Sequence, residues 1–378
     1  MVWLLAIGVT ELKLSRLQFD WPIISWVYLL IPIFSVLAGI FTVYVVYFDK
    51  DIMSLEAIRS KLINGYINDQ KLVRVIIMLF VIYAVSYVVI YLYVGFIPLF
   101  TKYPNEARTR WSLFGVGLLI HLAPLILYFV IAYFVIIKKQ YYKKLLMFLL
   151  FWVTLITFLF LLQRFGVFIT IILSIVLLYY GTNKLNLKTA FVIMIFVVGI
   201  SYLILSLRAG NLILQYFHQV SQMKYSAKYS IFTEPYMYIA MNLENYAYAT
   251  TKLKEFTYGL SSFDFLFAIS GIKHWLHEYV NFIDNPYLIN YNYNTYGMFF
   301  VNFRDFYVFG ILILPYFFGL VTSFVYYRMR TNPNLNSITL YGILVMVIMF
   351  SFFNPMLSWL FYIFDITVLY FTTFYITK

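Results

Sequence analysis

Arginine side chains recur beside the apolar segments of this 378-residue chain. A guanidinium group holds phosphate oxygens through two parallel hydrogen bonds and stays charged at any relevant pH. Several arginines that converge on one surface would therefore suit a diphosphate, whereas a single arginine can simply anchor its helix among lipid headgroups. Both interpretations stay open for the four candidate binding residues, which are Arg108, Arg164, Arg208 and Arg304.

Acid–base chemistry is a second possibility, in the polar stretch that holds most of the histidines. His274 and Glu278 are four residues apart, so they would share one face of a helix. Such a pair can orient a general base. The alternative is the ordinary polar face of a surface helix.

Metal and redox chemistry find little support in the sequence. The chain has no cysteine, which excludes disulfides, thiolate nucleophiles and cysteine-bound metals. It also lacks the His-Glu-x-x-His pattern of zinc hydrolases. We therefore expect no cofactor and no metal site.

The composition decides the class of protein. Residues are 63% hydrophobic, 22% aromatic and only 11% charged, too few charges to cover the surface of a soluble protein of this length. A protein embedded in a bilayer turns its apolar surface to lipid. The net charge of +12 does not indicate nucleic-acid binding, because the basic residues lie at the ends of apolar segments, as in membrane proteins.

About twenty apolar residues are needed to cross a bilayer as a helix. Nine segments are long enough, and the residues 1–10 would add a tenth span or lie in the interface, so we expect an all-α polytopic membrane protein with about ten transmembrane helices. The nine are Ile24–Phe48, Val73–Phe96, Ser112–Ile137, Leu145–Leu162, Phe165–Tyr180, Thr189–Leu207, Phe306–Tyr327, Ser337–Phe353 and Leu357–Ile376.

One long polar stretch divides this pattern. The sequence predicts N-terminal transmembrane helices over 1–207, a large loop with short helices over 208–305, and C-terminal transmembrane helices over 306–378. Within the loop, Thr233 and Pro235 predict the start of a helix that runs to Leu253. Residues 262–280 have apolar positions at helical spacing and could lie in the membrane interface.

Positive charge predicts the orientation. The short loops on one side carry 14 of the 27 Lys and Arg residues, and those on the other side carry 6. Cytoplasmic loops collect Lys and Arg, while long loops translocate largely regardless of charge. The large loop is therefore expected outside the cell, with both chain termini in the cytoplasm.

Two further signals bear on function. The loop is rich in Tyr and Asn, side chains that pack on sugar faces and bind hydroxyls, although Tyr also favours any membrane interface. Asp365 lies inside the last predicted span, where a carboxylate is either functional or bonded to a neighbouring helix.

Seven short motifs follow one another along the chain. They are Ile97–Phe100, Asn105–Arg108, Gln163–Gly166, Tyr238–Asn245, Tyr258–Gly259, Asn294–Tyr296 and Arg304–Gly310. In this order they resemble the motifs of the Wzy-type polymerases of O-antigen and capsular repeat units. The chain departs from that family in having Val308-Phe-Gly310 where the family often has Asp-Phe-Gly, and in lacking the Arg-x10-Gly spacing of some members.

The resemblance implies a glycosyltransferase in the bacterial plasma membrane that polymerises undecaprenyl-diphosphate-linked oligosaccharides on its outer face. It implies that the four arginines, with Asn294 and Tyr296, bind substrate, and that His274, Glu278 or Asp305 acts as the base. Membrane lipids and a chain-length regulator protein are the expected partners, and nucleic acid is not. The alternatives are a ligase that uses the same lipid-linked donor and a non-enzymatic lipid-oligosaccharide flippase.

Overall fold

The computed structural model describes residues 2–64, 68–137, 141–183, 213–276 and 287–378, with a few isolated positions between 185 and 199. These residues are mostly helical, and no strand occurs among them apart from one isolated bridge between Ser15 and Met223. The chain forms two compact units. The first comprises Met1–Lys50, Leu212–Tyr327 and Val347–Ile363, and the second comprises Asp51–Asn211, Arg328–Met346 and Phe364–Lys378.

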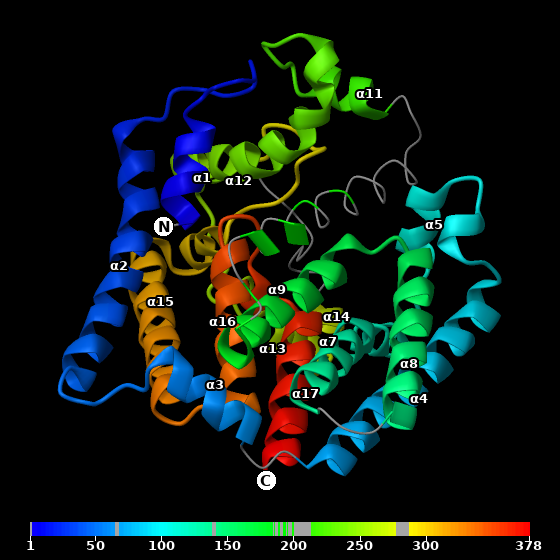
Figure 1. Ribbon diagram of the computed structural model, residues 1–378. Coiled ribbons are helices and arrows are strands. Elements are labelled where there is room, and N and C mark those ends of the chain that lie inside the picture. Colours follow the sequence, from blue (N-terminus) through cyan, green and yellow to red (C-terminus); the bar gives the residue numbers. More distant parts are fainter. Residues whose placement is uncertain are drawn as a thin grey trace. The chain divides into compact units, whose positions relative to one another are not determined.

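The helices follow one another as shown in Figure 1. In the first unit they are α1 (Val2–Thr10), α2 (Ile23–Tyr47), α11 (Ile213–Val220), η2 (Ala227–Phe232), α12 (Thr233–Lys252), α13 (Asp264–Ile269), α14 (Ile272–Leu276), most of α15 (Met298–Thr331) and η3 (Met356–Ser358). The second holds α3 (Leu55–Asn64), α4 (Asp69–Val94), η1 (Pro98–Phe100), α5 (Pro104–Arg110), α6 (Val116–Leu119), α7 (Leu122–Ile136), α8 (Tyr141–Phe160), α9 (Arg164–Gly181), and most of α16 (Leu335–Phe350) and α17 (Leu360–Thr377).

Six helical segments among the described residues are long and apolar enough to cross a membrane. They contain α2, α4, α6 with α7, α8, α15 and α17, and the shorter apolar segments Phe165–Gly181 and Leu335–Phe350 correspond to two more predicted spans. The predicted span Thr189–Leu207 lies almost wholly outside the described residues. The fold is therefore that of an all-α membrane protein, while the count of about ten spans is not reached.

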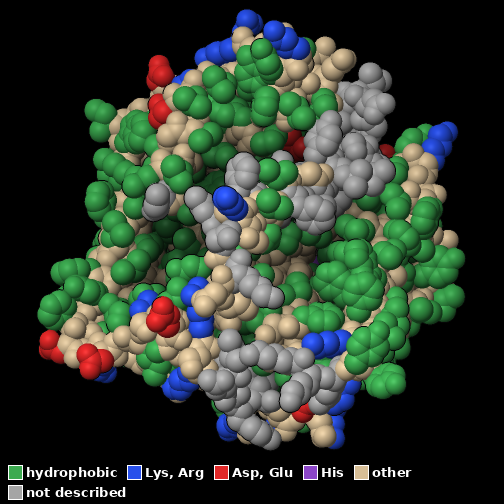
Figure 2. All heavy atoms as spheres, viewed as in Figure 1, with side chains coloured by type: hydrophobic (Ala, Val, Ile, Leu, Met, Phe, Trp, Pro, Cys, Tyr) green, Lys and Arg blue, Asp and Glu red, His purple; other side chains and the backbone are tan. Residues whose placement is uncertain are grey.

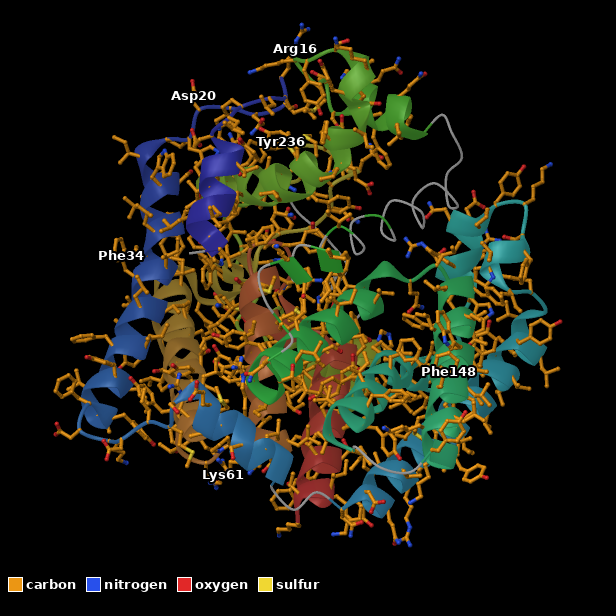
Figure 3. The ribbon with its side chains drawn as sticks, in the orientation of Figure 1. Arg16, Asp20, Phe34, Lys61, Phe148 and Tyr236 are labelled. Atoms are coloured by element: carbon orange, nitrogen blue, oxygen red, sulfur yellow. The ribbon has the colours of Figure 1, made fainter. Side chains whose placement is uncertain are left out.

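Small residues bring α2 and α15 into close contact. A Cβ added at Gly39 would lie 2.2 Å from the carbonyl oxygen of Tyr316, and one added at Gly319 would lie 2.2 Å from that of Val36. Ser35 donates a hydrogen bond from its hydroxyl to the carbonyl of Leu312. Spacings of four residues between small side chains are typical of helix pairs in membranes. On the face shown in Figure 2, hydrophobic side chains cover the flank formed by α2, and Phe34 on that flank is exposed (Figure 3).

Helix α12 forms the core of the first unit. It packs against α1, α2 and α11, and most of its side chains are buried. Helix α1 is only nine residues long, and it buries Trp3, Ala6, Ile7 and Thr10. Trp3 stacks on Phe299 at 4.5 Å between ring centroids. The segment 1–10 thus packs against α12 and the start of α15.

Helix α7 is the buried centre of the second unit and packs against α4, α8 and α9. Its Tyr128 hydroxyl lies 2.6 Å from that of Thr339 on α16. A Cβ at Gly166 would lie 2.7 Å from the ring of Pro124, so only glycine fits the contact between α9 and α7.

Several predicted boundaries shift for local reasons. Helix α12 spans the predicted range closely, but Thr233 is its first helical residue rather than its cap, and its hydroxyl pairs with that of Tyr225 at 2.9 Å. The helical pattern of 262–280 is broken at Gly271, whose φ of +73° ends α13 and begins α14. The span predicted from Phe306 starts at a break within α15, because Phe306 and Tyr307 depart from helical φ and ψ.

Candidate functional site

Two asparagines of α12 join the motif Tyr238–Asn245 to the segment that precedes α15. The side-chain amide of Asn245 donates to the carbonyl oxygens of Tyr293 (2.8 Å) and Thr295 (3.3 Å). Its oxygen accepts from the backbone N–H of Ile289 at 3.1 Å. The Asn242 side-chain oxygen accepts from the Thr295 hydroxyl. Both asparagines are buried, so these bonds fix residues 289–295 on α12.

Helix α15 is broken at Phe306, where the sequence predicts the start of a membrane span. Tyr307 has φ +53° and ψ −136°, a backbone conformation that residues other than glycine rarely adopt. The break, at Phe306 and Tyr307, folds the chain so that a Cβ at Gly310 would lie 1.9 Å from the carbonyl oxygen of Asn302. Strain of this kind costs about 1–3 kcal/mol and is concentrated at functional sites in proteins.

Asp305 sits immediately before this break and binds the loop 257–262. Its carboxylate accepts hydrogen bonds from the backbone N–H groups of Ser261 (3.1 Å) and Ser262 (2.5 Å) and from the Thr257 hydroxyl. The side chain is 1% exposed. With its oxygens occupied by three donors and no access to solvent, Asp305 is better placed to position the loop than to accept a substrate proton.

Arg304 lies at the same point. Its carbonyl oxygen accepts from the backbone N–H of Thr257 at 3.1 Å, so both residues of the Arg304–Asp305 pair hold the loop. The Arg304 side chain is partly exposed, unlike that of Asp305. A Cβ at Gly259 would lie 3.4 Å from the Phe306 ring, which places the Tyr258–Gly259 motif against the break. Tyr258 itself is 80% exposed.

A tyrosine pair fixes α2 to the broken helix. The hydroxyl groups of Tyr28 and Tyr307 lie 2.6 Å apart. The Tyr28 carbonyl oxygen also accepts a hydrogen bond from the buried Tyr246 hydroxyl of α12, at 2.9 Å. Burial raises the pKa of Tyr246, so its hydroxyl keeps its proton and acts as a donor at physiological pH.

A buried ion pair ties the segment 11–21 to α12. The Lys13 ammonium lies 2.9 Å from Glu244 Oε1, and this carboxylate also accepts from Gln18 (3.0 Å) and from the Trp21 indole (2.8 Å). Gln18 in turn accepts from the Tyr236 hydroxyl at 2.6 Å. Figure 3 shows Tyr236 on α12 below this segment. Glu244 is fully enclosed and fully paired, which indicates a structural role.

Four predicted site residues fall at the edge of the described chain or outside it. Arg208 and Glu278 lie outside the described residues. Of Arg164 and His274 only the backbone is described: Arg164 begins α9, and His274 lies in α14. Their predicted roles stay predictions.

The remaining predicted residues differ in accessibility. Arg108 lies on α5 in the second unit, where its Nε donates to the Asn105 side chain at 3.3 Å. Asn294 is exposed. Tyr296 is 4% exposed and stacks on Phe300 at 3.9 Å between centroids, so packing accounts for its position. Arg304 and Asp305 are the predicted pair that the structure joins to the large-loop motifs.

Sequence reasoning missed Asn242, Asn245 and Glu244 as organising residues. All three lie inside the motif Tyr238–Asn245, and polar side chains on the buried face of a helix were the available signal. Their partners lie far away in the sequence, in residues 13–21 and 289–295, and no spacing rule predicts those contacts.

No family model, no curated protein and no solved structure matches this chain in the comparisons.

Proposed function

We propose that this protein is a glycosyltransferase that polymerises lipid-diphosphate-linked oligosaccharide repeats, in the manner of the Wzy-type polymerases that its motifs resemble. The growing glycan is transferred from its undecaprenyl diphosphate to a hydroxyl group on the next lipid-linked repeat. The bond between the anomeric carbon and the diphosphate oxygen breaks, and the bond to the acceptor oxygen forms. The acceptor proton passes to a base, and the lipid diphosphate leaves.

One observation supports this proposal most. Four of the motifs that carry the resemblance form two linked pairs within the first unit, and the two motifs of each pair lie more than forty residues apart in sequence. Asn245 binds Thr295 in the motif Asn294–Tyr296, and Asp305 binds the loop that holds Tyr258 and Gly259. The second pair meets at the strained helix break, and strain of this kind is concentrated at functional sites.

Arg304 is the residue of this group best suited to the diphosphate. It is partly exposed, and its neighbour Asp305 fixes the adjoining loop. A guanidinium group that stabilises the leaving diphosphate would do so without a metal ion. In this proposal His274 or Glu278 acts as the base while Asp305 positions the loop. Substrate binding by Arg108, Arg164 and Arg208 rests on the resemblance alone.

We also propose how the chain is oriented in the membrane. The chain crosses the bacterial plasma membrane about ten times, with the large loop outside and both termini in the cytoplasm. The proposed substrate, an undecaprenyl-diphosphate-linked oligosaccharide, is then met on the outer face. A chain-length regulator protein is the proposed protein partner.

A reconstituted reaction tests the proposal. Purified protein in lipid nanodiscs is given lipid-diphosphate-linked repeats together with EDTA, and products are separated by size. We expect a ladder of longer glycans and one free lipid diphosphate for every linkage formed. Dependence on a divalent ion would contradict the metal-free mechanism, and the absence of any ladder with authentic repeats would contradict the polymerase itself.

A matched pair of variants tests the arginine. A point charge cannot replace a guanidinium fork on a diphosphate, so Arg304→Lys should lower turnover by about ten-fold or more, the loss expected for one transition-state hydrogen-bond partner. Arg16→Lys, at an exposed position of the same unit labelled in Figure 3, should leave turnover unchanged. Equal turnover in the two variants would reduce Arg304 to a structural residue.

One observation favours the flippase alternative. Asp365 on α17 is 1% exposed, and both of its carboxylate oxygens lack a hydrogen-bond partner among the described residues. Carboxylates buried within a span often belong to proton or substrate pathways. A flippase would move lipid-linked repeats across proteoliposomes without lengthening them, and Asp365→Asn would stop that movement. Polymerisation that survives Asp365→Asn would favour the polymerase.

A further inference from the structure

Helices α13 and α14 present a continuous set of exposed apolar side chains. Leu266 and Ile269 on α13 are 53% and 63% exposed, and Ile272 and Trp275 on α14 are 47% and 83% exposed. Leu266 and Ile269 are three residues apart on α13, and Ile272 and Trp275 are three apart on α14, so each pair lies on one side of its own helix. Isolated exposed apolar residues need no explanation, but an ordered row on two consecutive helices does.

An ion pair joins the two helices. The Lys273 ammonium on α14 donates to the Asp264 carboxylate on α13 at 2.5 Å, with both side chains partly buried. Gly271 has φ +73°, which permits the sharp turn that brings the two helices together. The paired charges are therefore less exposed than the four apolar side chains.

The loop before α13 is bound to α15, and this contact indicates what covers the apolar row. Residue Ser262, two positions before α13, is bound through its N–H to Asp305 at 2.5 Å, and its hydroxyl lies 3.1 Å from the Asn302 side-chain oxygen. Asp305 lies in α15, a helix long and apolar enough to cross a membrane. The two short helices are thus held beside a candidate membrane span, at the break in α15.

We infer that α13 and α14 form a monotopic membrane anchor, which lies in the boundary between lipid headgroups and acyl chains. Leu266, Ile269 and Ile272 insert toward the acyl chains, and Trp275 occupies the headgroup level that tryptophan favours. The Lys273–Asp264 pair faces the protein and water. The anchor sets the depth of the loop 257–262, and hence of Arg304, relative to the lipid surface. This inference depends on membrane insertion and not on the reaction that the protein catalyses.

Fluorescence quenching tests the anchor in the full-length protein. The chain has no cysteine, so a single Ile269→Cys variant takes one environment-sensitive dye. The labelled protein is placed in nanodiscs made with acyl-brominated phospholipid. We expect brominated lipid to reduce the fluorescence at residue 269 about two-fold or more, as for a side chain a few ångströms below the headgroups. Aqueous iodide should have little effect.

Ser226→Cys is the matched control, since Ser226 is exposed in the same unit and lies just before η2. Its dye should respond to iodide and not to brominated lipid. Equal iodide quenching at 269 and 226 would overturn the inference. If residue 269 is protected from both quenchers, protein covers the row. If soluble oligosaccharide relieves the iodide quenching, the row is a sugar-binding surface. Either outcome overturns the anchor.

Discussion

Glu244, Asp305 and Asp365 are buried carboxylates that differ in their partners. Glu244 pairs with an ammonium and two further donors, and Asp305 accepts from two backbone N–H groups and a hydroxyl. Asp365 has no partner among the described residues. A buried charge is tolerated when its hydrogen bonds are complete, so the first two residues stabilise the fold and the third is the one that needs a functional reason.

Removal of Lys13 should cost more stability than removal of the whole ion pair. Lys13→Met leaves the enclosed Glu244 carboxylate without its counter-ion, which we expect to cost about 3 kcal/mol, the lower end for a buried pair because the Lys13 side chain is 19% exposed. Lys13→Met combined with Glu244→Gln should recover part of this loss. Thermal unfolding in detergent measures both, and a double variant less stable than Lys13→Met would contradict the argument.

Asp305→Asn separates a positioning residue from a base. The amide group would turn an N–H toward the backbone donors of Ser261 or Ser262, so we expect the loop 257–262 to loosen and turnover to fall together. A cysteine introduced at the exposed Tyr258 reports the loosening as faster reaction with a thiol reagent. Lost turnover with an unchanged labelling rate would instead support the predicted role as base.

At the scale of elements, the contact between α2 and α15 depends on glycine. Gly39→Ala would place a methyl group 2.2 Å from the Tyr316 carbonyl oxygen, so the helices must separate. We expect a loss of roughly 1–3 kcal/mol, the usual cost of overpacking. Gly8→Ala in α1, where nothing lies within 4 Å, should instead be neutral or stabilise by up to about 1 kcal/mol. Equal unfolding temperatures for the two variants would contradict the close packing.

Elements were easier to predict from the sequence than their contacts. Apolar length predicts α2, α4, α8, α15 and α17, because about twenty apolar residues have one low-energy conformation in a bilayer. The strained break at Phe306–Tyr307 leaves no trace in apolar periodicity. It depends on Asp305 binding a loop more than forty residues away in the sequence, and only the folded chain brings these residues together.

At the scale of the whole chain, sequence blocks and compact units do not coincide. The segment 1–50 precedes most predicted spans, yet it belongs to the same unit as the large loop, because Trp3, Lys13 and Trp21 bind residues beyond 240. A segment that the sequence assigns to the N-terminal membrane region thus packs with the helices of the large loop. We therefore expect deletion of residues 1–21 to unfold α12 and not merely to remove one membrane contact.

Orientation is the property of the whole chain that labelling can decide. The 14-to-6 distribution of Lys and Arg predicts that residues 208–305 face outward and that Gln140 faces the cytoplasm. Tyr291→Cys and Tyr142→Cys form a matched pair, since these tyrosines are 84% and 86% exposed and lie on opposite predicted sides. In intact cells an impermeant thiol reagent should label residue 291 at once and residue 142 only after the membrane is opened. The reverse pattern would invert the topology and place Arg304 and the break in α15 on the cytoplasmic side. A diphosphate-linked glycan that has already crossed the membrane could not reach Arg304 there.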